Sequence, residues 1–148
     1  MDTDNSSRFD TSVIELPREL IIRDVGKRIF VCQGDAIKEY VLSGKQKIGR
    51  PVPGEIPDIP IDCEHVSRKH GFFLTDDENA SYIAEETTNG IFLNGKEIVA
   101  SGSADLEDGD ELTIPSWKDG IRSDIRITCA FSPQKIAFWE NIMRSREG

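Results

Sequence analysis

Short apolar runs, interrupted every few residues by turn-forming residues, recur along the sequence from residue 27 onward. The interruptions are clusters of glycine, proline, asparagine and aspartate, which end strands and favour turns. Many short strands at this spacing predict an all-β sandwich or barrel, and the pattern alone does not choose between the two. The predicted strands cover residues 28–32, 39–42, 46–49, 59–61, 71–74, 82–85, 91–93, 111–114 and 122–131.

The pair Asn94-Gly95 gives the strongest local prediction. It lies between the apolar run 91–93 and the segment 96–98. Asn-Gly favours a two-residue turn whose backbone twist matches that of the flanking strands. We therefore expect a tight hairpin at this point, with Asn94 as a turn residue.

The two ends of the chain differ from the middle. Residues 1–26 form a tail that we expect to be partly disordered, because its first part is almost entirely polar. Residues 133–148 are expected to form a C-terminal helix, with Ser132 as its N-cap and Pro133 in its first turn. The sequence thus divides into a tail, a β domain over residues 27–132, and this helix.

The predicted helix has an apolar stripe of Ile136, Trp139 and Met143. Two interpretations of the helix stay open from the sequence. It packs back on the β domain, or it begins a linker to a region outside this chain.

Composition narrows the classes of function. The formal net charge of −9 argues against a general nucleic-acid binder, which needs a basic surface. No apolar run is long enough to span a membrane. The cysteines, Cys32, Cys63 and Cys129, are three in number and far apart, so we interpret them as reduced thiols of a cytoplasmic protein.

Three polar clusters fall between the predicted strands, where a rigid sheet presents binding groups. They place an arginine at Arg50, a hydroxyl at Ser67 and an amide at Asn89. A guanidinium, a hydroxyl and an amide together make a donor set suited to the oxygens of a phosphate dianion. We also expect five basic residues to gather at one end of the β domain and to create a local positive field there: Lys45, Lys47, Arg50, Arg68 and Lys69.

These clusters resemble those of the forkhead-associated (FHA) domain, a module that binds phosphothreonine peptides. The matching segments are Ile48-Gly49-Arg50, Val66-Ser67-Arg68-Lys69-His70, Thr88-Asn89-Gly90-Ile91-Phe92-Leu93-Asn94-Gly95 and Leu106-Glu107-Asp108-Gly109-Asp110-Glu111-Leu112. The resemblance covers about residues 28–132. It implies a two-sheet antiparallel β-sandwich with binding loops at one end, and phosphothreonine-dependent recognition in Ser/Thr kinase signalling.

The resemblance also assigns roles to individual residues. It implies that the phosphopeptide is bound by Arg50, Ser67, Arg68, Thr88 and Asn89, and it makes His65 a candidate specificity residue. It implies structural roles for Gly49, His70, Gly90 and Asn94. The proline-rich connection at residues 51–60 is expected to be stiff and to shape the peptide groove.

Enzymatic interpretations are weaker. Ser67 and His70 have the spacing of a nucleophile and a base, but no orienting third group or nucleophile elbow accompanies them. Cys63, His65 and His70 make a weak metal pattern, since a second ligand pair is missing. We therefore expect no catalytic site, no metal and no cofactor.

Two further hypotheses remain from the sequence. The first is a scaffold or assembly domain that uses the same sandwich without phosphate. The second is that the N-terminal segment around Thr11, once phosphorylated, folds back and occupies the site of its own domain. The segment Asp10-Thr11-Ser12-Val13-Ile14 resembles one that precedes the domain in small bacterial FHA regulators.

Overall fold

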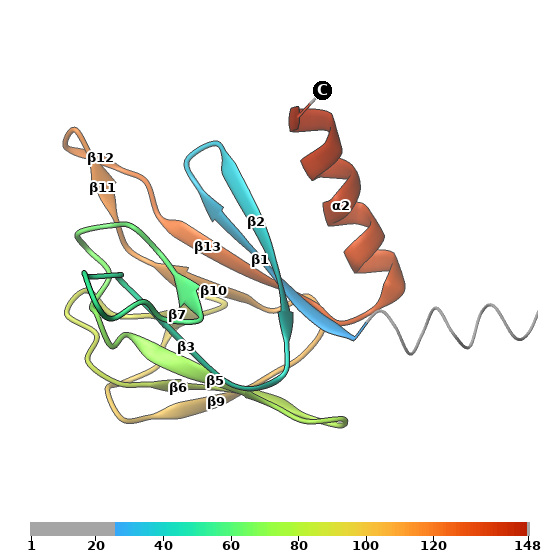
Figure 1. Ribbon diagram of the computed structural model, residues 1–148, viewed down its shortest axis with the longest axis horizontal. Coiled ribbons are helices and arrows are strands. Elements are labelled where there is room, and N and C mark those ends of the chain that lie inside the picture. The colour runs from blue at the N-terminus through green and yellow to red at the C-terminus, as the bar shows by residue number, and fades with distance from the viewer. Residues whose placement is uncertain (1–25, 148) are drawn as a thin grey trace, which may run out of the picture.

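Two β-sheets stack face to face, and one helix lies beside them (Figure 1). This computed structural model describes residues 26–147. Apart from Gly26, the predicted tail and the segment around Thr11 lie outside the described residues. The sandwich expected from the FHA resemblance is confirmed, and a barrel is excluded because the two sheets are separate.

The first sheet has six strands in the order β2-β1-β13-β10-β7-β8, all antiparallel. Its strands are β1 (Lys27–Gln33), β2 (Ala36–Leu42), β7 (Phe92–Leu93), β8 (Lys96–Glu97), β10 (Glu111–Ile114) and β13 (Ile125–Ala130). The β1–β2 turn brings Gln33 opposite Ala36, and the long central strands β1 and β13 pair from Arg28 opposite Ala130 to Cys32 opposite Arg126.

The second sheet has five strands in the order β4-β3-β5-β6-β9. Its strands are β3 (Gly44–Gly49), β4 (Ile59–Pro60), β5 (Gly71–Thr75), β6 (Ala80–Ala84) and β9 (Ser103–Leu106). Only the short β3–β4 pair is parallel. The strands β11 (Trp117–Lys118) and β12 (Ile121–Arg122) form a separate hairpin that belongs to neither of these two sheets.

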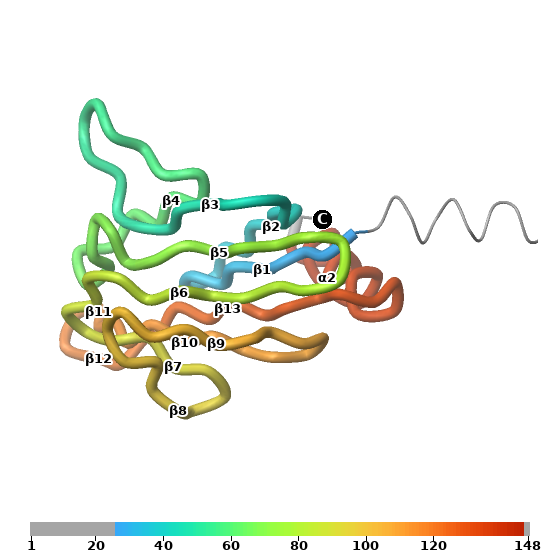
Figure 2. The backbone as a smooth tube through the Cα atoms, turned by 90° about the horizontal axis from the view of Figure 1, so that it is seen from below, coloured from blue at the N-terminus to red at the C-terminus, as the bar shows by residue number. Residues whose placement is uncertain are grey.

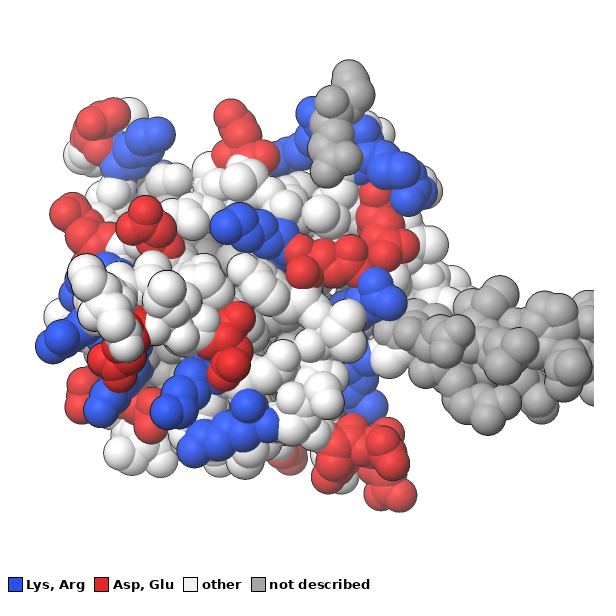
Figure 3. Space-filling view, viewed as in Figure 1, with Lys and Arg blue, Asp and Glu red and all other residues white. Residues whose placement is uncertain are grey.

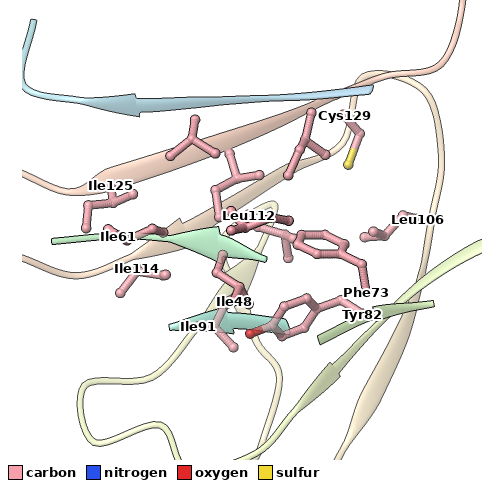
Figure 4. Packing of buried hydrophobic residues seen from close by; sticks show 14 of the residues in the cluster. Ile48, Ile61, Phe73, Tyr82, Ile91, Leu106, Leu112, Ile114, Ile125 and Cys129 are labelled. Atoms are coloured by element: carbon pink, nitrogen blue, oxygen red, sulfur yellow. The ribbon is translucent and has the colours of Figure 1, made fainter. Parts of the chain in front are cut away.

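The core fills the space between the two sheets (Figure 4). Along β6 the buried residues alternate with partly exposed ones, as a strand with one face in the core requires. Phe73 of β5 and Tyr82 of β6 meet edge to face in this core, with ring centroids 5.1 Å apart. They pack with Ile48 of β3 and with Leu112 and Ile127 of the first sheet, all fully buried.

The hairpin predicted at Asn94-Gly95 is confirmed. Leu93 of β7 pairs with Lys96 of β8 across the turn. Asn94 and Gly95 both have positive φ, 49° and 88°, as the twisted two-residue turn requires. The Asn94 side chain also accepts a hydrogen bond from the Glu111 amide at 2.9 Å, which fastens the turn to β10.

The single strand predicted at residues 122–131 is wrong in its first part. Residues 121–122 belong to the β11–β12 hairpin, and β13 begins only at Ile125. Between them, Asp124 accepts a hydrogen bond from the Ser116 amide at 3.3 Å, and the Ser123 amide donates to the Ser116 carbonyl at 2.7 Å. These bonds turn the chain before it enters the sheet. Strand β9 was not predicted, because its sequence Ser-Ala-Asp-Leu is short and largely polar.

The helix α2 (Pro133–Glu147) packs back on the outer face of the first sheet (Figure 1). Ser132 caps it as predicted, since its hydroxyl accepts from the Lys135 amide at 3.2 Å. Ile136 is buried against Phe30 and Ala130, and the rings of Trp139 and Phe30 stack with centroids 5.7 Å apart. The interpretation that the helix packs back on the β domain is confirmed.

Gly71 is required by close packing inside the second sheet. A Cβ atom at Gly71 would overlap the Tyr82 hydroxyl and the Ile83 carbonyl. The Tyr82 hydroxyl is buried and has no hydrogen-bond partner within the described residues. Burial raises the pKa of this phenol, so it stays neutral.

Replacing Trp139 with alanine should lower the free energy of unfolding by about 2 kcal/mol, because a large, partly buried ring leaves Phe30 exposed. Phe138 on the same helix is 58% exposed, so Phe138→Ala is the matched control and should cost well under about 1 kcal/mol. Urea denaturation measures both. Equal losses for the two variants would contradict the packing of α2 on the sheet.

Tyr82→Phe should leave the free energy of unfolding unchanged or raise it by about 1 kcal/mol, because it removes a buried hydroxyl that has no partner. Gly71→Ala should instead destabilise the domain by about 2 kcal/mol or more, since the sheet must distort to admit the methyl group. Thermal melts compare the two variants. A marked loss of stability in Tyr82→Phe would show that the hydroxyl does have a partner.

Candidate functional site

The loops that carry the three polar clusters lie at one end of the sandwich (Figure 2). They follow β3, β4 and β6, and α2 lies at the opposite end. The β11–β12 hairpin extends from the same end as these loops (Figure 2). Clusters that are 17 to 39 residues apart in the sequence therefore meet in space, as the contacts below show in detail.

Arg50 follows directly after β3 and is fixed by two hydrogen bonds. Its backbone amide donates to the Ser67 carbonyl at 3.0 Å, and its Nε donates to the Val66 carbonyl at 3.1 Å. Gly49 allows this approach, because a Cβ at that position would overlap the Arg68 carbonyl. Within residues 26–147 the terminal nitrogens of the Arg50 guanidinium make no hydrogen bond or ion pair.

Ser67 and Thr88 face each other across two loops. The Thr88 amide donates to Ser67 Oγ at 3.2 Å, and Ser67 Oγ lies 3.4 Å from Thr88 Oγ1. Both hydroxyls lie at the surface. The structure thus brings Arg50, Ser67 and Thr88 together, as expected from the sequence.

The buried side chain of His70 joins the β4–β5 loop to the β6–β7 loop. Its Nδ1 accepts a hydrogen bond from the Ser67 amide at 3.1 Å, and its Nε2 lies 3.0 Å from the Gly90 carbonyl. Only the neutral ring with a proton on Nε2 satisfies both contacts. Burial lowers the pKa of this fully buried histidine, although the hydrogen bond to Gly90 opposes part of that effect.

This arrangement removes the enzymatic interpretation of Ser67 and His70. The imidazole bonds to the backbone amide of Ser67, and the Ser67 hydroxyl points toward Thr88 instead. Both ring nitrogens are engaged, so His70 has none left to bind a metal ion. In the described part of the chain no group of three or more acidic, histidine or cysteine side chains is placed to hold a metal.

The Asn89 side chain connects the loop that carries it to the loop that carries His65. Its Nδ2 donates to the His65 carbonyl at 3.0 Å, which ties the β6–β7 loop to the β4–β5 loop. The amide oxygen of Asn89 has no partner among residues 26–147. Gly90, which follows, has a φ of 86°. Any residue other than glycine would be strained in this backbone conformation.

The surroundings of His65 were missed by the sequence analysis. Its Nδ1 lies 3.2 Å from Ser116 Oγ, and its ring meets the edge of the Trp117 ring at 5.3 Å. Trp117 and Ile121 of the β11–β12 hairpin are 41% and 70% exposed. Periodicity gave no signal for this hairpin, because each of its strands has two residues and one short turn joins them.

The five basic residues predicted to gather do so. Lys45, Lys47, Arg50, Arg68 and Lys69 all line one hollow of about 230 Å³ beside the site. The stiff connection also contributes to its wall through residues 55–57. The face of the molecule in Figure 3 has basic and acidic side chains interspersed, in keeping with the negative net charge of the whole chain.

Cys32, Cys63 and Cys129 are all free, and burial raises the pKa of the Cys129 thiol to about 12. Between residues 26 and 147 no helix has the length and apolar character needed to cross a membrane.

Comparison with known proteins shows which family of domains the sequence and the fold resemble. Residues 47–115 match the family model of the FHA domain. No curated protein matches the chain. Several solved structures share its fold, and they are themselves FHA domains. Residues 47–115 therefore match the FHA domain family in sequence, and the chain shares the fold of FHA domains, which are interaction modules rather than enzymes.

Three of these structures show the extent of the likeness. The N-terminal FHA domain of Rad53p from S. cerevisiae, solved with a phosphothreonine peptide, is 20% identical with a TM-score of 0.55, over 76% of this chain and 98% of that one. The FHA domain of an Arabidopsis thaliana hypothetical protein is 22% identical with a TM-score of 0.54, over 74% and 91%. The FHA domain of CT664 from Chlamydia trachomatis is 14% identical with a TM-score of 0.58, over 72% and 97%.

The neutral state of His70 predicts a pH dependence. Because burial lowers its pKa below the ordinary 6.5, the unfolded chain takes up the proton more readily than the folded one. This contribution to the free energy of unfolding is complete above pH 6.5 and should decline as the pH falls below that value. Urea denaturation between about pH 7 and pH 5 should show the decline.

An NMR titration of the His70 ring provides the direct check. The midpoint should lie below 6.5, the ordinary value. A midpoint at or above that value would mean that the protonated ring fits the folded site, and would contradict the hydrogen-bond scheme.

Proposed function

We propose that the FHA domain of this chain, residues 27–132, binds phosphothreonine-containing segments of partner proteins in Ser/Thr kinase signalling. The proposed binding residues are Arg50, Ser67, Arg68, Thr88 and Asn89. One observation carries the proposal: these side chains converge on one end of the sandwich, and the terminal nitrogens of the Arg50 guanidinium have no partner there within residues 26–147. The buried His70 holds the loops of Ser67 and Gly90 in that arrangement.

Each proposed contact follows from the chemistry of its group. The free end of the Arg50 guanidinium suits two phosphate oxygens at once, and the adjacent Nε bond to Val66 holds the side chain in place. The Ser67 and Thr88 hydroxyls add donors beside it. The free amide oxygen of Asn89 is available to accept from the peptide backbone.

The alternative is a scaffold that uses the sandwich without phosphate. Such a domain has no need for Arg50, Ser67 and Asn89 to converge. The Rad53p structure, solved with a phosphothreonine peptide, also supports the phosphate-dependent function, although the two chains share only 20% of their residues. His65, beside the exposed Trp117, is proposed to contact peptide residues that flank the phosphothreonine.

Arg50→Ala should weaken binding of a phosphothreonine peptide library by about 2–5 kcal/mol, because it removes a charge-assisted pair from a partly desolvated site. Ser67→Ala and Asn89→Ala should each cost about 1–3 kcal/mol. Fluorescence polarisation or calorimetry measures the dissociation constants, with the unphosphorylated library as the reference.

Arg126→Ala is the matched control, since Arg126 is an exposed arginine of β13 whose guanidinium lies 3.7 Å from Glu111. It should leave the dissociation constant unchanged. If Arg50→Ala folds normally and binds as tightly as the native chain, the proposed site is wrong. If the native chain binds both libraries equally, the scaffold interpretation takes its place.

A further inference from the structure

A thiol, a hydroxyl and an imidazole form a hydrogen-bonded cluster beside the proposed binding site. Cys63 Sγ lies 3.2 Å from Ser116 Oγ and 3.8 Å from His65 Nδ1, and Ser116 Oγ lies 3.2 Å from the same ring nitrogen. Cys63 and His65 belong to the β4–β5 loop, whereas Ser116 directly precedes the β11–β12 hairpin. A nucleophilic atom, a base and a bridging hydroxyl are thus brought together from two segments of the chain.

The backbone fixes the direction of the hydrogen bonds in this cluster. The Trp117 amide donates to His65 Nδ1 at 3.4 Å, so this nitrogen is an acceptor and the neutral ring carries its proton on Nε2. The Ser116 hydroxyl then donates to Nδ1 and accepts from the Cys63 thiol. A proton that leaves Sγ therefore has a continuous path through Ser116 Oγ to His65 Nδ1.

The charges that this proton transfer creates have partners close by. The protonated ring of His65 and the thiolate of Cys63 form an ion pair, which favours the nucleophilic form of the sulfur. On the other side of the ring, Nε2 lies 3.8 Å from Oε2 of Glu64, whose carboxylate attracts the imidazolium. The Glu64 side chain is 84% exposed, so water weakens this attraction and the ion pair with the thiolate contributes more.

The other two cysteines of the chain lie in different environments. Cys129 is fully buried, and burial raises the pKa of its thiol to about 12. Cys32 is partly exposed, but burial raises the pKa of its thiol as well, and no hydrogen bond within residues 26–147 joins it to either histidine. Cys63 is partly exposed and has a base within hydrogen-bonding distance, so a dissolved reagent reaches it in its reactive form.

We propose that Cys63 is a modification site that exchanges with low-molecular-weight disulfides, with His65 as the base and Ser116 as the proton bridge. The thiol proton passes to His65 Nδ1 as Sγ attacks one sulfur of the reagent disulfide. The S–S bond of the reagent breaks, a new S–S bond forms at Cys63, and the leaving thiolate takes the proton from the imidazolium. One reagent molecule thus yields one mixed disulfide and one free thiol, and an added dithiol reverses the change.

The position of Cys63 links this chemistry to the proposed phosphothreonine site. The His65 carbonyl accepts from Asn89 Nδ2 at 3.0 Å, so the loop that carries the cluster is also joined to the loop that carries Asn89. An adduct on Sγ needs space that Ser116 Oγ and the His65 ring occupy, at 3.2 and 3.8 Å. The adduct therefore displaces the β4–β5 loop from the β11–β12 hairpin and weakens peptide binding, a consequence that rests on the proposed function.

Mass spectrometry of the native chain after treatment with hydroxyethyl disulfide, an uncharged reagent, tests the site without any phosphopeptide. At neutral pH the adduct should form at Cys63 about tenfold faster than at Cys32 or Cys129, or faster still. His65→Gln should slow the reaction at Cys63 by about tenfold, because it removes the base that receives the thiol proton. The control Cys32→Ser should react at Cys63 at the native rate.

Peptide binding is the second measurement. The adduct at Cys63 should weaken binding of the phosphothreonine library by about fivefold, which corresponds to the loss of one hydrogen bond between the loops. Dithiothreitol should restore the native affinity. Cys63→Ser, which cannot form the adduct, should bind the library equally well before and after treatment with the reagent.

Equal rates at Cys63 and Cys32 in the native chain would overturn the inference, and so would a His65→Gln variant that reacts at the native rate. Unchanged peptide binding by the fully modified chain would overturn the link between the adduct and recognition. A chain that forms the adduct selectively at Cys63 but binds no phosphothreonine peptide in either state would support the modification site and refute the proposed function alone.

Discussion

The site depends on one buried, neutral imidazole. His70 joins the amide of Ser67 in one loop to the carbonyl of Gly90 in another, and burial keeps the ring uncharged. These two bonds join the loop of Ser67 to the loop of Asn89 from inside the protein, and the bond from Asn89 to the His65 carbonyl joins the same loops at the surface. A buried polar group that is fully satisfied gives a unique arrangement to the parts it connects, and here those parts are the two loops that present the polar side chains.

Close backbone contacts also join the end of β3 to the loop that carries Ser67. Gly49 admits the Arg68 carbonyl, and the Arg50 amide then bonds to the Ser67 carbonyl. The end of β3 is thereby fixed against the loop that carries Ser67. Hydrogen bonds to backbone groups thus join three separate segments, and within residues 26–147 they leave the terminal nitrogens of Arg50 without a partner. The uneven distribution of charge, with a positive hollow on a negative molecule, then favours ligands with well-placed anions.

The sequence determined the class of fold and the central residues of the candidate site. Turn-forming pairs such as Asn94-Gly95 act locally, because the turn depends on the φ angles of two residues, and that hairpin is confirmed. The cap at Ser132 is local in the same way. Strand β9 and the β11–β12 hairpin escaped prediction, since two to four residues carry too little periodic signal to be distinguished from a loop.

Only the tertiary structure decided how distant residues combine. The apolar stripe on α2 does not by itself say what covers it, and the structure shows that Phe30 of the first sheet does. The role of His70 depends on which atom of Ser67 faces it, and the spacing of the two residues does not reveal that. The basic hollow likewise needs β3 and the β4–β5 loop side by side. Sequence patterns report the preferences of neighbouring residues, whereas these contacts form when the two sheets stack and bring separate loops to one end.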